Sequence, residues 1–170
     1  MGAPQERSAG GTVTQAGPPT STYLSMTQRS PQARFDHRLV LGSSRRGIQR
    51  AQRSLISAAQ QRGYDHASCF ALRLALEEAL TNAILHGNRN NPRKKVTVRY
   101  RVDSGRVVIE IEDQGEGFDP QAVPDPTRPE NVEIPAGRGI VLMRAYMTEV
   151  EFTAPGNRVR MTYVRPTVRG

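Results

Sequence analysis

The feature that most constrains the fold is a helical stretch over residues 72–90, LRLALEEALTNAILHGNRN. Its apolar residues recur at helical spacing and predict one buried face: Leu72, Leu76, Leu80 and Ala83. Glu78 and Asn82 lie four residues apart, so a helix places them one turn apart on the same face. The small Ala79 beside them leaves room for another group to approach.

The Glu78 and Asn82 pair has two interpretations. The amide oxygen of Asn82 is a suitable ligand for a hard cation such as Mg²⁺, and the Glu78 carboxylate can accept a proton or orient a water. Glu and Asn on helices more often belong to a solvated face. The helix alone favours the second interpretation, so the choice depends on the rest of the chain.

A hairpin follows the helix. Residues 95–102 and 107–113 alternate apolar and polar side chains around an Asp103-Ser104-Gly105 turn. Asp113 continues the buried row of the return strand, where a carboxylate is costly unless it has a partner. Gly115 and Gly117 come directly after it, and glycines allow a backbone to approach a ligand closely. The pattern DxGxG therefore indicates either a binding site or a simple glycine turn.

Residues 120–136 hold five of the twelve prolines and show no hydrophobic period, which is typical of a functional or mobile loop. We expect a lid-like segment here. Gly137, Arg138 and Gly139 then precede a predicted helix over 140–147. Glycines at a helix start expose backbone N–H groups, so this stretch is a candidate anion site.

The remaining ordered elements are a strand, a helix and a closing hairpin. A short strand is predicted over 38–41, and a helix begins after Ser44 and ends at Gly63. The hairpin pairs residues 148–153 with 158–164. Residues 1–33 are rich in Gly, Pro, Ser, Thr and Gln and predict a disordered tail, which leaves one domain over residues 34–166.

Charge and cysteine content limit the function classes. The formal net charge of +8 permits nucleic acid as a partner, but charge is the only feature that favours it, so we expect no direct nucleic-acid binding. The single cysteine, Cys69, excludes an internal disulfide framework. The sequence has no signal peptide and no run of 18 apolar residues, so we expect a cytoplasmic protein without a membrane partner.

The three weak motifs occur in an order that resembles the GHKL ATPase superfamily. EEALTNAILHGN is similar to its first motif, DQGEGFDP to its second and GRGIVLMRAYM to its third. The short form of the chain most resembles the anti-sigma-factor serine/threonine kinases, over about residues 35–165. The resemblance implies an α+β Bergerat fold, in which helices pack on one face of a mixed β-sheet.

The resemblance also implies ATP and Mg²⁺ as cofactors, with a role for each motif. Asn82 would bind the Mg²⁺ that bridges the phosphates, and Glu78 would be the general base. Asp113 would accept a hydrogen bond from the adenine amino group. Gly115 and Gly117 would let the base pack against the backbone. Gly137, Arg138 and Gly139 would bind the phosphates.

The implied function is an ATP-dependent kinase and sigma-factor antagonist. Its partners would be a sigma factor and a STAS-type anti-anti-sigma protein, and a homodimer is possible. Some kinases of this group have an Arg just before the third motif, where this chain has residues 134–136, Ile-Pro-Ala. Arg138 or Arg128 could substitute. The alternatives are a nucleotide-gated binding module with little kinase activity and a detached histidine-kinase ATPase domain.

Overall fold

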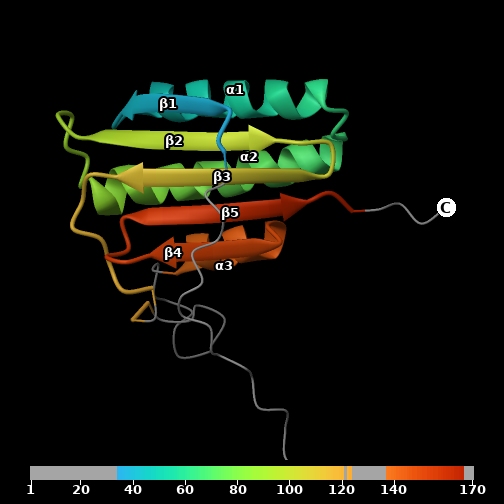
Figure 1. Cartoon of the computed structure of the whole chain (residues 1–170). Helices are drawn as coiled ribbons and strands as arrows, with labels where there is room; N and C mark the ends of the chain where they lie inside the picture. The colour runs from blue at the N-terminus through green and yellow to red at the C-terminus, as the bar shows by residue number, and fades with distance from the viewer. Residues whose placement is uncertain (1–33, 121, 124–136, 167–170) are drawn as a thin grey trace, which may run out of the picture. The chain divides into compact units, whose positions relative to one another are not determined.

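The computed structural model describes residues 34–120, 122–123 and 137–166. In that part of the chain, three α-helices and one π-helical turn lie on one face of a five-stranded sheet (Figure 1). The elements in chain order are β1 His37–Gly42, α1 Arg45–Gln61, α2 His66–Asn82, the π-helical turn η1 Ala83–Gly87, β2 Lys95–Val102, β3 Arg106–Asp113, α3 Arg138–Tyr146, β4 Glu149–Thr153 and β5 Arg158–Val164. The predicted N-terminal tail and most of the predicted lid lie outside the described residues.

The predicted α+β fold with helices on one face is confirmed, but the expectation of a mixed sheet is wrong for the described strands. The strand order is β1-β2-β3-β5-β4, and all four neighbouring pairs are antiparallel. Tight hairpins join β2 to β3 and β4 to β5, and a hairpin connects only antiparallel strands. The helix pair α1–α2 crosses the sheet and returns, so β2 also begins beside the end of β1.

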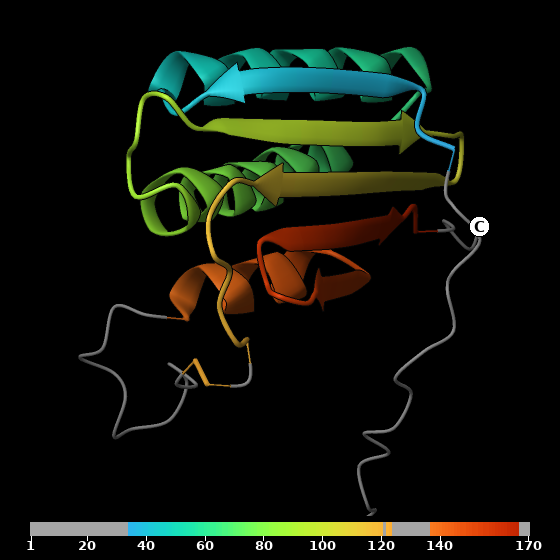
Figure 2. The same cartoon turned by 60° about the vertical axis from the view of Figure 1, so that its left-hand side comes forward.

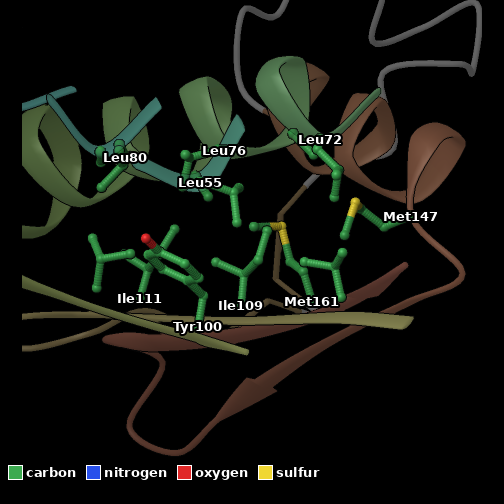
Figure 3. Packing of buried hydrophobic residues seen from close by; sticks show 14 of the residues in the cluster. Leu55, Leu72, Leu76, Leu80, Tyr100, Ile109, Ile111, Met147 and Met161 are labelled. Atoms are coloured by element: carbon green, nitrogen blue, oxygen red, sulfur yellow. The ribbon is translucent and has the colours of Figure 1, made fainter. Parts of the chain in front are cut away.

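The core lies between the helices and the sheet. Leucines of α1 and α2 point toward aromatic and aliphatic side chains of β2, β3 and β5 (Figure 3). The labelled members from the first two helices and these strands are Leu55, Leu72, Leu76, Leu80, Tyr100, Ile109, Ile111 and Met161. Each is at most 1 % exposed, and burying one such side chain stabilises the fold by about 1.5–3 kcal/mol.

Helix α1 has the predicted ends. The Ser44 side chain accepts a hydrogen bond from Gly47 N, as an N-cap does. At the other end Gly63 takes a left-handed φ of 76°, and Tyr64 N donates to Ala59 O at 3.1 Å. This is a Schellman ending, which favours glycine because other residues are strained at that φ.

Helix α2 lies between α1 and α3 on the sheet (Figure 2). Its N-cap is Asp65, whose Oδ1 accepts a hydrogen bond from Ser68 N at 2.8 Å. The helical stretch predicted over residues 72–90 is not one regular helix, because the α-helix ends at Asn82 and a π-helical turn follows. Asn88 N donates to Ala83 O at 2.8 Å, five residues back, so the wider turn re-aims the chain directly after Asn82.

Candidate functional site

A cavity of about 320 Å³ opens where α2, β3, α3 and the β4–β5 turn meet. Residues from all three sequence motifs border it, although they are far apart in the chain. The lining residues from the predicted site are Asn82, Asp113, Gly117, Gly137 and Gly139. Much of the remaining wall is apolar and comes from the core, including Ala79, Ile111, Met143 and Val159.

Gly139 brings the third motif against the first. A methyl group on Gly139 would lie 2.8 Å from Glu78 Oε2 and 3.2 Å from Asn82 Nδ2. Both distances are shorter than an ordinary van der Waals contact, so a side chain at residue 139 would displace these two groups. The polar pair on α2 therefore faces the backbone at the start of α3, and the solvated-face interpretation does not describe it.

Asp113 is buried, as the alternation of apolar and polar side chains along its strand predicted. It is the last residue of β3, pairs with Val96 and is 9 % exposed. Its Oδ1 accepts a hydrogen bond from Gly115 N at 2.7 Å. Burial raises the pKa of this carboxyl, against the smaller opposing effects of the Gly115 hydrogen bond and the Lys94 charge. A buried carboxylate at a cavity wall is suited to accept a hydrogen bond from a ligand.

Gly87 and Gly115 hold the Asp113 carboxylate between two pieces of backbone. A Cβ on Gly87 would collide with both carboxylate oxygens, and a Cβ on Gly115 would collide with Gly87 O. Gly115 does not line the cavity, and a Cβ on it would also meet Asp113 Oδ1 at 2.7 Å. Sequence reasoning missed Gly87, because closing the helix was the only role that its position suggested.

Gly117 lines the cavity and also packs against the β4–β5 turn. It has a left-handed φ of 84°, and a Cβ there would collide with Pro155 O. Gly156, at a φ of 99°, meets Phe118 O in the same way from the opposite side. The loop after β3 and the turn between β4 and β5 are therefore interlocked through two glycines.

Asn88 is a second residue that sequence reasoning missed. It lies directly after the π-helical turn and is fully buried. Its Nδ2 donates to Lys95 O at 3.1 Å, and its Oδ1 accepts from Gln114 N at 2.9 Å. Asn88 thus ties the end of the π-helical turn to β2 and to the residue after Asp113, and the sequence offered only its place next to Gly87 as a signal.

Helix α3 begins at Arg138, two residues before the predicted start at residue 140, so Gly137 alone of the two glycines precedes it. Gly137 precedes the helix with a left-handed φ of 86°, and Val141 N donates to Gly137 O at 3.1 Å. Arg138 is exposed and does not line the cavity. Val123, from the predicted lid, lines the cavity, whereas Arg128 and residues 134–136 lie outside the described residues.

Two features are absent from the described part of the chain. Within residues 34–120, 122–123 and 137–166, no group of three or more His, Cys, Asp or Glu side chains could hold a metal ion. In the same residues, no helix is both long enough and apolar enough to cross a bilayer.

Comparison with known proteins gives a family for this arrangement. Residues 43–163 match the family model described as the histidine kinase-like ATPase domain. The serine-protein kinase RsbW of Bacillus velezensis is 31% identical over 116 residues, which cover 64% of this chain and 72% of the relative. RsbW of Oceanobacillus iheyensis is 29% identical over 107 residues, 59% of this chain and 68% of the relative. The anti-sigma F factor of Geobacillus stearothermophilus is 30% identical over 98 residues, which cover 55% of this chain and 66% of the relative.

Proposed function

This chain belongs to the histidine kinase-like ATPase domain family, and from that membership we propose that it is an ATP-dependent serine/threonine protein kinase and anti-sigma factor. It would bind ATP with Mg²⁺ in the cavity between α2, β3 and α3. It would hold a sigma factor in one state and phosphorylate a STAS-type anti-anti-sigma protein in another. Such a regulator of transcription would act in the cytoplasm, and a homodimer is possible.

The observation that carries this proposal is the convergence of the three motifs on one cavity. Gly139 lies against Glu78 and Asn82, while Asp113 lines the same cavity from the end of β3. Two relatives are named serine-protein kinases and a third is named an anti-sigma F factor. The shared family supports ATP binding, and the names of the relatives support the kinase and anti-sigma activities.

Asp113 is the residue that we propose reads the adenine base. The carboxylate is buried at the cavity wall and offers acceptor oxygens, and the adenine amino group is a donor. One of these oxygens, Oδ1, accepts a hydrogen bond from Gly115 N. A ligand donor on the cavity side would compensate the cost of a carboxylate held at a buried position.

The phosphate end of the nucleotide would lie between α2 and the start of α3. Asn82 would bind Mg²⁺ through Oδ1, and backbone N–H groups of Gly137, Arg138 and Gly139 would face the phosphates. Mg²⁺ in nucleotide sites is usually held by one or two protein oxygens together with phosphates and water. The Asn82 side chain lines the cavity, and its amide oxygen would be one such protein ligand.

Glu78 would act on the attacking serine hydroxyl. Its Oε2 faces the backbone of Gly139, which places the carboxylate next to the proposed phosphate position. From there it would accept the hydroxyl proton or orient the hydroxyl oxygen for attack on the terminal phosphorus. Phosphoryl transfer depends mainly on such positioning and on charge stabilisation, which bound Mg²⁺ supplies.

The first alternative is a nucleotide-gated binding module with little kinase activity. It is favoured by the Ile-Pro-Ala sequence of residues 134–136, where some kinases of the group have an Arg. A detached histidine-kinase ATPase domain is less well supported, because it would need a phospho-accepting His on a dimerisation helix. The three His residues fall in β1, at the start of α2 and in the π-helical turn.

Phosphate transfer from labelled ATP separates these functions. The full chain is incubated with Mg²⁺, labelled ATP and each anti-anti-sigma protein of its own cell. A labelled serine or threonine on one of those proteins supports the kinase proposal. ATP binding without any transfer would favour the binding module, and label on a histidine would favour the histidine-kinase alternative.

A further inference from the structure

Two phenylalanines on different elements form an aromatic pair at the cavity wall. Phe118 lies in the loop after β3 and Phe152 lies on β4, and both line the cavity. Their ring centroids are 5.3 Å apart and the planes meet at 73°, an edge-to-face arrangement. Phe152 packs against the core, whereas Phe118 is 39 % exposed. The inner ring therefore supports an outer ring that keeps free aromatic surface.

The backbone that positions this pair also positions Asp113. Gly117 and Gly156 interlock the Phe118 loop with the β4–β5 turn. Asp113 N donates to Asn157 O at 3.0 Å, and Asn157 Nδ2 donates to Asp113 O at 3.1 Å. The loop, the turn and the end of β3 are thus joined as one unit, with a carboxylate and an aromatic ring at the same cavity.

We propose that Phe118, supported by Phe152, is the aromatic contact for the nucleobase whose amino group Asp113 binds. This inference rests on the proposed ATP site. It gives a role to Phe118, which belongs to the second motif but had none assigned. Asp113 would fix the edge of the base by a hydrogen bond, while Phe118 would cover apolar base surface. An aromatic ring suits this purpose because bases stack on aromatic side chains.

The first test is a fluorescence titration with a new reporter. The chain has no Trp, so Phe118→Trp adds a single indole, and Phe70→Trp is a matched control. Phe70 is 52 % exposed on α2 and does not line the cavity. We expect ATP, and adenosine at higher concentration, to quench the indole at residue 118 and leave the control unchanged. Quenching by ATP that saturating adenosine fails to reproduce would assign the signal to phosphates and overturn the inference.

The second test separates ligand contact from folding. Phe118→Ala should weaken ATP binding by about tenfold or more, as loss of base stacking does. Phe118→Leu keeps an apolar side chain, so it should melt like the wild type without ATP and still bind ATP more weakly. Phe118→Tyr should restore affinity. Wild-type affinity in Phe118→Leu would overturn the inference alone, whereas a wild-type protein that fails to bind ATP would overturn the proposed function as well.

Discussion

Gly139 faces Glu78 so closely that a methyl group on the glycine would lie 2.8 Å from Glu78 Oε2. The two residues lie far apart in the sequence, yet this contact joins the α2 motif to the start of α3. A side chain larger than hydrogen at residue 139 would displace the side chains of Glu78 and Asn82.

Gly139→Ala should damage nucleotide binding more than it damages folding. The new methyl group meets the ends of two flexible side chains, Glu78 and Asn82, which can move aside. We expect ATP affinity in Mg²⁺ to fall by about tenfold, since both proposed phosphate-end groups are displaced. Gly105→Ala is the control, because a Cβ there meets no atom within 4 Å. Equal ATP affinity in both variants by calorimetry would show that the contact does not shape the site.

Asn82→Ala should remove the Mg²⁺-dependent part of nucleotide affinity. Asn82 lines the cavity at the last residue of α2, and its amide oxygen is the proposed metal ligand. Calorimetric titration of wild type and variant with ATP, each with and without Mg²⁺, measures this part directly. If Mg²⁺ strengthens binding to the variant as much as to the wild type, Asn82 is not a metal ligand.

Glu78→Gln should keep ATP affinity and lose phosphoryl transfer by roughly 10²–10⁴-fold, the usual contribution of a general base. The amide preserves the size of the side chain but removes its capacity to accept a proton at neutral pH. Glu77→Gln is a matched control on the exposed side, where Glu77 Oε2 accepts from Gln52 Nε2 at 3.1 Å. Turnover by Glu78→Gln at the wild-type rate, on a true antagonist substrate, would remove the base role.

The acid limb of the stability curve should depend on Glu112. The Arg158 hydrogen bond is the main cause that lowers the pKa of Glu112, and Arg99 contributes as well. The resulting stabilisation is present above the unfolded-state pKa and is lost as the pH falls through the lower folded-state value. Because these side chains are partly exposed, Glu112→Gln should cost about 1 kcal/mol at pH 7.

The same variant should converge with the wild type at acidic pH, which denaturant titrations at several pH values would show. Glu116→Gln is the control, since the Arg89–Glu116 pair is 3.5 Å apart and highly exposed. A difference between Glu112→Gln and wild type that stays constant from pH 7 down to acid would show that the loss is one of packing and not of charge.

Hydrophobic periodicity predicted the elements and the burial of Asp113, because those features follow from local sequence. The phase of β3 placed this carboxylate in the core-facing row, and the structure confirms its burial. The π-helical turn, the burial of Asn88 and the contact of Gly117 with Pro155 were not predictable. The last two depend on contacts between segments distant in sequence, and a local sequence pattern does not contain such contacts. The mixed sheet came from the resemblance and not from periodicity.

We propose that Asp113 binds the base of a bound nucleotide, and Asp113→Asn tests this role. Burial raises the pKa of Asp113, so the ionised carboxylate destabilises the folded protein increasingly as the pH rises through that pKa. The amide removes this cost, and the apo variant should be as stable as the wild type or more stable. The amide would also present a donor to the adenine amino group.

The most direct measurement is ATP affinity by calorimetry at pH 7, paired with the melting temperature of the apo protein. Loss of a hydrogen bond to a charged group costs about 1.5–3 kcal/mol, so Asp113→Asn should bind ATP at least about tenfold more weakly. Its apo melting temperature should be equal to that of the wild type or higher. A variant that melts lower without nucleotide, yet binds ATP with unchanged affinity per folded molecule, would contradict the account and make Asp113 a structural residue of the β3 end.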